Sequence, residues 1–491
     1  MLLSMVVSLY TSRVVLNTLG VEDYGIYNVV AGVVVMFSFL NAGMIAASQR
    51  FISFELGTKN VERLKDVFTS SVLIHLCIAL TIFIIAETLG LWFVNTKLNI
   101  ENSRLIATNW VYQCSIFSFL MGVISVPYSS CIVAHEKMKA FAYIGLLDVC
   151  LKLIIVYILV LIEYDKLKLY SLLVTVVSIV IQIIYIYYCR YNFVECRYRF
   201  VFDKKLLREM FVFASWSFIG NLGFSFKDQG SNIILNIFCG TTVNAARGIA
   251  YQVSGVINNF SSNFLMALNP QITKAYAKGN ILYMTKLISK GCRYSFYLLS
   301  IIIIPVFVKI EYLIDLWLVE VPYYTYNFLR LSLIISIINS MANPLVVAIQ
   351  ATGRIRDFQI IIAIVMLLDL PLYFLLLKNN YVPYSVMYIS ISTSIIGLFI
   401  RVWLMSKLIP YNIKFFFIHI FCKNMILFGL SLLSCFCFNK YISSNYIGLI
   451  FSLLLYFIIV VIIFYIFGLD KEEQLFLKNK ITTLYNKYKL K

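Results

Sequence analysis

The segment SRVVLNTLG at residues 12–20 returns later in the chain as SNIILNIFCG at residues 231–240. Both segments lie within apolar stretches. Further matches follow in the same order, at separations between 217 and 225 residues: Asn60 with Asn280, Trp92 with Trp317, Pro127 with Pro344, and Asp148 with Asp369. An ordered series of matches at a nearly constant separation predicts that one helical bundle occurs twice in this chain.

The composition indicates an integral membrane protein. Hydrophobic residues make up 61% and charged residues 13% of the 491 residues, and the mean hydropathy is +0.87. A water-soluble core cannot bury that much apolar surface. Apolar runs of about 20 residues, the length of a helix that crosses a bilayer, recur from end to end. The sequence predicts about fourteen spans, near residues 1–18, 25–48, 68–93, 105–133, 140–162, 169–189, 211–238, 242–267, 292–318, 324–350, 357–378, 383–407, 416–438 and 446–468.

The distribution of positive charge predicts the orientation. Lys and Arg are concentrated in alternate connections, near residues 50–65, 137–139, 190–208, 274–290, 354–356, 407–414 and 471–491. The opposite connections contain acidic residues such as Asp23, Asp165 and Glu320, with only scattered lysine and arginine. The positive-inside rule therefore predicts that the basic loops and both termini are cytoplasmic. The net charge of +18 marks a face that lies against anionic membrane lipids, so no nucleic-acid partner is expected.

Soluble catalytic domains and metal sites are not expected. The longest polar stretch, about 190–210, is followed at once by another apolar run. The eleven cysteines lie mostly within apolar runs and show no C-x-x-C spacing, which is typical of packing residues. His75, His135 and His419 are widely separated in the sequence. We therefore predict that the protein is not an enzyme and has no catalytic residue, metal site or cofactor.

Both copies of the repeat begin on the same side of the membrane. The two six-helix bundles are therefore expected to be related by an axis along the membrane normal. The predicted domains are residues 1–195 and 196–410 for the bundles, 411–470 for two appended helices, and 471–491 for a basic cytoplasmic tail. Alignment of Ser12 with Ser231 leaves the first span shorter than its counterpart. We expect the first helix to be truncated, with a basic lead-in missing.

Several segments carry a family resemblance. LGVEDYGIY at residues 19–27 resembles the L-G-x-E-x-Y-G-x-Y signature of Wzx-type polysaccharide flippases, in the MATE-like multidrug/oligosaccharidyl-lipid/polysaccharide superfamily. Residues 229–232, 244–250 and 351–353 are similar to later motifs of that family. The resemblance covers nearly the whole chain. It implies an all-α polytopic MATE-like protein of the cell inner (cytoplasmic) membrane.

The resemblance also implies a substrate and partners. The family moves undecaprenyl-pyrophosphate-linked oligosaccharides from the cytoplasmic to the periplasmic leaflet by alternating access, for surface polysaccharide such as O-antigen. H⁺ or Na⁺ are the candidate coupling ions, and the polysaccharide polymerase machinery is a candidate partner. Transfer of two phosphates and a sugar into hydrocarbon is strongly unfavourable. The carrier must therefore provide a hydrated, positively charged passage for them.

Two polar segments are the candidates for such a passage. The run KDQGSN at residues 227–232, which begins with Lys227 and Asp228, lies inside an apolar stretch too short to form a span on either side of it. We therefore expect one irregular helix whose polar middle lines a cavity, the alternative being a misplaced helix boundary. On the next helix a polar stripe at spacings of three and four contains Arg247, Tyr251, Ser254, Asn258 and Ser261. For this stripe the alternatives are hydrogen bonding between helices and, for Arg247, snorkelling to the interface.

Isolated charges complete the predicted site. Arg13 is a candidate for holding the pyrophosphate, because its planar fork matches phosphate oxygens; pairing with a neighbouring acid is the alternative. Asp148 and Lys152 share one helix face and are expected to neutralise each other, or to form a substrate- or proton-linked pair. Asp369 has no lysine after it, and an unpaired buried carboxylate stays protonated. Asp148, Asp228 and Asp369 are therefore the candidates for ion coupling, with structural hydrogen bonding as the alternative.

Three other classes of function are alternatives to a flippase. An ion-coupled multidrug or small-molecule exporter of the same superfamily would share the two-bundle plan, but usually ends after twelve helices and favours acidic cavities. The added helices at 416–468 and the cations Arg13, Lys227 and Arg247 favour an anionic substrate. A membrane polysaccharide polymerase, which is an enzyme, would need a sizeable outer loop. A purely structural assembly protein gives no reason for a polar interior.

Overall fold

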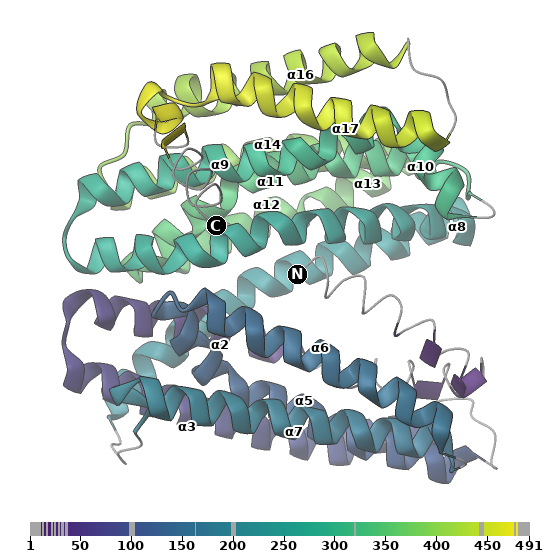
Figure 1. Cartoon of the computed structure of the whole chain (residues 1–491), viewed down its shortest axis with the longest axis vertical. Helices are drawn as coiled ribbons and strands as arrows, with labels where there is room; N and C mark the ends of the chain where they lie inside the picture. Colours follow the sequence, from purple (N-terminus) through teal and green to yellow (C-terminus); the bar gives the residue numbers. More distant parts are fainter. Residues whose placement is uncertain are drawn as a thin grey trace, which may run out of the picture. The chain divides into compact units, whose positions relative to one another are not determined.

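The computed structural model describes residues 38–97, 104–162, 164–197, 203–318, 321–440 and 446–475, with individual positions between 11 and 34 and at 478–479. All regular elements in these ranges are helices (Figure 1). The main helices are α2 (Ser38–Thr58), α3 (Val61–Ile85), α4 (Leu91–Lys97), α5 (Leu105–Ala134), α6 (Met138–Leu161), α7 (Lys166–Asn192), α8 (Lys204–Ala277), α9 (Ile281–Val308), α10 (Ile310–Trp317), α11 (Thr325–Thr352), α12 (Arg356–Leu367), α13 (Asp369–Lys378), α14 (Val386–Leu408), α16 (Lys423–Asn439) and α17 (Tyr446–Ile463). The predicted all-α class is confirmed.

Ten helices in the described ranges are long and apolar enough to cross a membrane. They run over Val61–Thr96, Leu105–Ala134, Met138–Leu161, Lys166–Asn192, Ile281–Val308, Thr325–Thr352, Arg356–Lys378, Pro383–Leu408, Ile413–Asn439 and Ile447–Gly468. Each matches one predicted span. Of the other four, the span at 1–18 falls largely outside the described residues, the span at 25–48 is described in part and includes the start of α2, and those at 211–238 and 242–267 are the two arms of α8. The count of fourteen stays a prediction.

The long helix α8 turns at Gly240, the residue that ends the repeated segment. Gly240 has φ 79° and ψ −176°, a backbone conformation that only glycine adopts readily. Its counterpart Gly20 also has a positive φ of 80°. The expected irregularity at 227–232 is wrong, because this run is regular helix and the break lies eight residues beyond Asn232. Because the polar run has no backbone break, it can contribute only side chains to a cavity.

We expect Gly240→Ala to destabilise the protein by about 1–3 kcal/mol, the cost of forcing a side chain into that backbone region. A Cβ at Gly240 would meet nothing within 4 Å, so backbone strain alone produces the effect. Gly248→Ala is the matched control, because that position is equally open but helical. Alanine there should leave stability unchanged or raise it by about 0.5–1 kcal/mol. Equal melting temperatures of the two purified variants in detergent would contradict the assignment of the turn.

Local structure explains several of the repeated residues. Asn60 caps α3 by accepting a hydrogen bond from the backbone N–H of Arg63 at 3.1 Å, and Asn280 caps α9 by accepting one from Tyr283 at 3.1 Å. The residue before each cap, Lys59 or Gly279, has a positive φ. Asparagine suits this position because its side-chain oxygen satisfies a backbone donor at the start of the helix. Rotation of one bundle onto the other about the membrane normal stays a prediction.

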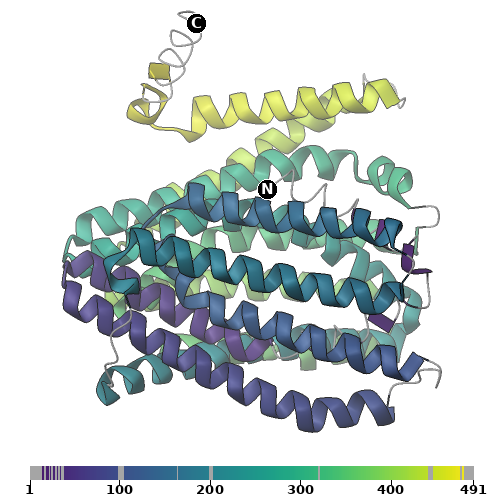
Figure 2. The ribbon, with the colours of Figure 1, turned by 60° about the horizontal axis from the view of Figure 1, so that its bottom comes forward.

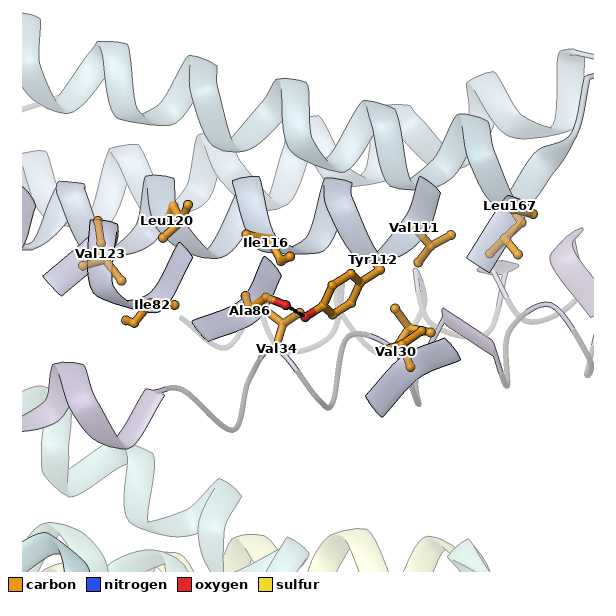
Figure 3. Packing of buried hydrophobic residues seen from close by; sticks show 13 residues of the cluster. Val30, Val34, Ile82, Ala86, Val111, Tyr112, Ile116, Leu120, Val123 and Leu167 are labelled. Carbon is orange, nitrogen blue, oxygen red and sulfur yellow. Dashed lines mark hydrogen bonds between the residues drawn. The ribbon is translucent and has the colours of Figure 1, made fainter. Parts of the chain in front are cut away.

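The described helices pack in two compact units: residues 1–222 with 273–279, and residues 223–272 with 280–491. In the first unit, α5 packs most extensively against α7 and also against α2 and α3. These helices run side by side in both views (Figures 1 and 2). The hydroxyl of Tyr112 donates a hydrogen bond of 2.7 Å to the carbonyl of Ala86 inside an apolar cluster that includes Val34 and Ile116 (Figure 3). This bond satisfies the one polar atom of a buried aromatic side chain.

In the second unit α11 packs against α9 and α14, and the two appended helices α16 and α17 pack on α9 (Figure 1). Arg293 of α9 donates hydrogen bonds to Asp470 at 2.9 Å and Glu473 at 2.6 Å, just beyond the last span. Burial raises the pKa of Asp470, but the hydrogen bond from Arg293 and the positive charges of Arg293, Lys423 and Lys290 together outweigh it, so this pKa lies below its usual range. The predicted domain boundaries at 195, 410 and 470 stay a prediction.

Candidate functional site

The second unit contains a cavity of about 290 Å³ between α8, α11, α12 and α14. Its polar lining residues are Lys227, Asp228, Arg247, Tyr251, Ser254, Asn258, Ser332, Ser336, Asn339, Ser390, Thr393, Ser394 and Arg401. Six of these residues come from the two polar segments that the sequence singled out on α8. Both segments therefore face one space, and the turn at Gly240 brings them together.

Arg247 is fixed by three partners from α8. It donates a hydrogen bond of 2.7 Å to the carboxylate of Asp228 and another to the side-chain oxygen of Asn232, and its guanidinium lies 4.2 Å from the ring centre of Tyr251. The residue is 4% exposed. A snorkelling arginine keeps its head group in water, so that alternative does not describe Arg247. Its guanidinium lies in the cavity lining, where the carboxylate of Asp228 balances its charge and Asn232 and Tyr251 fix its position.

Asp369 is paired, contrary to the prediction. It lies at the start of α13, is 0% exposed, and forms an ion pair with Lys227 of α8. Tyr373 and Thr393 donate further hydrogen bonds to its Oδ2 atom, at 3.0 and 3.2 Å. The helix of Asp369 has no lysine one turn later, which is why the sequence predicted an unpaired carboxylate. The partner instead comes from a helix 142 residues earlier in the chain, which no local spacing rule could find.

Arg401 was not among the predicted site residues, yet it carries the unbalanced charge of the cavity. It lies on α14, lines the cavity and is 8% exposed. Its Nε atom has no hydrogen-bond partner, and no described carboxylate lies within ion-pair distance of its guanidinium. A Cβ at Gly397, one turn earlier, would lie 2.9 Å from Arg401 Nη1, so the glycine makes room for the guanidinium. The sequence does indicate this residue, because Arg401 is a single charged residue inside the apolar run 386–406, and such residues usually have a function.

Ser254 and Asn258 of the stripe line the cavity and also form hydrogen bonds to α11, whereas Ser261 is buried outside the cavity lining. Ser254 and Ser332 share a hydrogen bond of 2.6 Å, and Asn258 donates one of 3.0 Å to Ser336. The alternative of interhelical hydrogen bonding therefore holds alongside the cavity role. These contacts keep α8 and α11 at a defined spacing along the cavity wall.

Two of the remaining predicted residues lie in the first unit and are not part of this cavity. Asp148 and Lys152 belong to α6 of the first unit and form the expected ion pair, with Lys152 donating to Asp148 at 2.8 Å. Arg13 lies outside the described residues. The candidate site therefore contains Lys227, Arg247 and Arg401 as cations, with Asp228 and Asp369 as the two carboxylates that pair with the first two of them.

A labelling experiment tests whether the cavity is wet. We expect single cysteines at Ser254 and Asn258 to react with a membrane-impermeant maleimide, because only a hydrated thiol ionises and attacks it. A cysteine at Ile233, an exposed apolar position, should remain unlabelled. Ser231 lies in the run that the sequence predicted to line a cavity, but it is buried outside the lining, so a cysteine there should also remain unlabelled. The eleven native cysteines are replaced first. Equal labelling, or equal protection, at all four positions would contradict the presence of a hydrated cavity.

The comparison with protein families gives a match. The model of the family described as polysaccharide biosynthesis protein matches residues 1–276. A search of the curated proteins gives no match.

Solved structures show the same fold. A MATE protein in the straight conformation aligns with a TM-score of 0.69 and 14% identity, over 82% of this chain and 93% of that one. An outward-facing multidrug resistance MATE family transporter of the MOP superfamily gives 0.68 and 14%, over 82% and 92%. A MOP superfamily transporter from Pyrococcus furiosus, described as having a binding pocket of reverse polarity, gives 0.67 and 13%, over 82% and 93%. The predicted MATE-like fold is confirmed, and family and fold together support a multi-pass membrane transporter.

Proposed function

Since the chain belongs to the polysaccharide biosynthesis protein family, we propose that it flips undecaprenyl-pyrophosphate-linked oligosaccharides from the cytoplasmic to the periplasmic leaflet. The membrane is the cell inner membrane, both termini are cytoplasmic, and transport proceeds by alternating access of the cavity. The observation that carries the proposal is Arg401, a buried guanidinium without a described counter-ion in a polar cavity.

The charge of the cavity favours an anion. Lys227 is balanced by Asp369 and Arg247 by Asp228, which leaves the charge of Arg401 for a ligand. A guanidinium binds phosphate oxygens through two parallel hydrogen bonds, and the low dielectric inside a membrane protein strengthens such contacts. We assign Arg401 to the pyrophosphate, with Arg247 and Lys227 as cations that can exchange their carboxylates for it.

The size of the cavity favours binding of one part of the substrate. Pockets for drug-sized ligands start at about 300 Å³, and this cavity of about 290 Å³ is too small for a lipid-linked oligosaccharide. Transfer of the phosphate groups into hydrocarbon costs more free energy than transfer of any other part of the substrate. Binding in a polar site therefore stabilises the phosphates most. In the proposal the sugar and the lipid tail extend away from the cavity, and Tyr251, Ser254 and Asn258 hydrogen-bond the polar groups nearest the phosphates.

Ion coupling is proposed at the paired carboxylates. Release of Lys227 or Arg247 to a phosphate would leave Asp369 or Asp228 free to take up H⁺ or Na⁺. Uptake of a cation by the carboxylate would then offset the charge that the phosphate brings. Asp148 with Lys152 in the first unit is the third candidate pair. The polysaccharide polymerase machinery is the proposed recipient of the flipped glycan.

An ion-coupled multidrug exporter is the second candidate function, favoured by the likeness to multidrug MATE structures. Export of cationic drugs needs a carboxylate that the resting protein leaves uncompensated. Asp228 and Asp369 each have a basic partner, which argues against this function. A membrane polymerase is the third candidate, for which we assign no catalytic residue.

Deletion of the gene separates these functions. We expect the deletion strain to accumulate lipid-linked oligosaccharide on the cytoplasmic leaflet, and a plasmid copy of the gene to reverse the accumulation. Drug susceptibility should not change. A strain with normal surface polysaccharide, no accumulated lipid-linked sugar and increased drug susceptibility would instead identify an exporter.

A further inference from the structure

Four metal-ligating side chains meet at one end of the first unit, on the predicted cytoplasmic side. Cys131 and His135 lie at the end of α5, and Glu195 and Cys196 lie in the short turn Val194–Cys196 after α7. One donor atom from each of Cys131, His135 and Glu195 lies within 4.8 Å of the other two. Cys131 Sγ lies 3.6 Å from Cys196 Sγ. The transport proposal uses none of these groups.

Local structure holds these groups in place. Cys131 and His135 are four residues apart, so they project from one face of α5. The thiol of Cys189 donates a hydrogen bond of 3.4 Å to the carbonyl of Tyr128, which holds the end of α7 against α5. The ring of His135 stacks on Phe193 with centroids 4.1 Å apart, and its Nε2 atom contacts Glu195 Oε1. The imidazole therefore points its Nε2 atom at the other three groups.

Two thiols, an imidazole and a carboxylate offer the four ligands that a closed tetrahedral zinc site needs. Zn²⁺ binds cysteine, histidine and carboxylate ligands with tetrahedral geometry, and two thiolates about 2.3 Å from one metal lie about 3.8 Å apart. The distance of 3.6 Å between the two sulfurs is close to that value. Cys131 Sγ also lies 3.3 Å from Glu195 Oε1. Mixed sulfur, nitrogen and oxygen ligands favour Zn²⁺ over Mg²⁺ or Ca²⁺, which prefer oxygen alone.

Burial and access are also consistent with a metal site. Cys131, Glu195 and Cys196 are buried, whereas the side chain of His135 is 24% exposed. A metal ion could therefore arrive past the histidine and end up shielded from water. We propose that Cys131, His135, Glu195 and Cys196 bind one Zn²⁺ ion, which joins the end of α5 to the turn after α7. The sequence predicted no metal site, because the two halves of this one are about 60 residues apart and no short spacing motif connects them.

Metal content and cobalt spectroscopy test the proposal on the full chain. The protein is purified in detergent, stripped with a chelator and loaded with Zn²⁺ or Co²⁺. We expect one metal ion per chain, a thiolate-to-cobalt charge-transfer band, a higher melting temperature with Zn²⁺, and protection of Cys131 and Cys196 from alkylation. A metal that binds only the folded state stabilises it by mass action.

Variants identify the ligands. Cys196→Ser and His135→Asn should each weaken Zn²⁺ binding at least about tenfold, since even the loss of a group behind a ligand costs that much. Cys77→Ser and His419→Asn, at exposed positions, should bind as the wild type does. Should the variants fail to fold, the cobalt band and the alkylation pattern of the wild type decide. Absence of stoichiometric metal, unchanged binding in the two ligand variants, or a Cys131–Cys196 disulfide in freshly isolated membranes would overturn the proposal.

Discussion

Replacement of Arg401 by alanine is expected to abolish transport while the protein remains in the membrane at normal abundance. Arg401 has no carboxylate partner among the described residues, so its removal leaves no buried charge unpaired. The loss of a charged contact to phosphate should cost about 3 kcal/mol, which corresponds to a roughly 100-fold lower rate. Complementation of the deletion strain, with immunoblots of the membrane fraction, measures both quantities.

Lysine at the same position separates charge from geometry. Arg401→Lys should restore part of the activity, because an ammonium supplies the charge without the two-pronged fork. Arg354→Ala removes an arginine from an exposed turn after α11 and should complement fully. Full complementation by Arg401→Ala would mean that the guanidinium has no role in binding the substrate, and the argument for an anionic ligand would fail.

Asp369→Ala should cause the second largest loss of transport. We expect this loss because the unstable variant protein should be depleted from the membrane. This change removes the fully buried partner of Lys227, whose own side chain is 18% exposed, and breaking a buried ion pair typically costs about 3–5 kcal/mol. The double variant Lys227→Met, Asp369→Leu replaces both charges by apolar groups of similar size and should recover normal abundance. Its transport rate should remain at least about tenfold below wild type, because the cavity lining has lost the cation Lys227 together with the buried carboxylate that pairs with it.

Two outcomes of the comparison between the single and the double variant would contradict the proposed role of this ion pair. A double variant as scarce as Asp369→Ala would mean that the two side chains do not stabilise each other. A double variant with normal abundance and full transport would make the pair purely structural and remove Asp369 from ion coupling. Asp357→Ala, at an exposed carboxylate on α12, serves as the control for abundance.

The features on which the sequence and the structure agree are local ones. The predicted stripe from Arg247 to Ser261 follows helical spacing, and the structure places four of its five residues along one cavity wall, with Ser261 buried outside the lining. Asn60 and Asn280 recur because a helix begins at each of them. A period of three to four residues or a capping residue is visible in a short window of sequence, since only backbone geometry produces it.

The features that the sequence missed depend on contacts between distant segments. Asp369 meets Lys227 through the packing of α13 against α8, and Cys131 meets Glu195 through the turn after α7. Neither pair shares a helix, so no spacing rule connects its members. Arg401 could have been found, because a single charge inside an apolar run is costly unless it serves a role.

The central claim is that the cavity binds the phosphate groups of a lipid-linked glycan during transport. It is tested most directly by reconstituting the purified protein in liposomes that carry an undecaprenyl-pyrophosphate-linked oligosaccharide in one leaflet, with arrival of the glycan in the other leaflet detected by an enzyme that cannot cross the bilayer. We predict that wild type moves the pyrophosphate-linked glycan, that Arg401→Ala does not, and that neither moves the same glycan on a phosphate-free lipid. Equal rates for the charged and the phosphate-free lipid, or equal rates for wild type and Arg401→Ala, would contradict the claim.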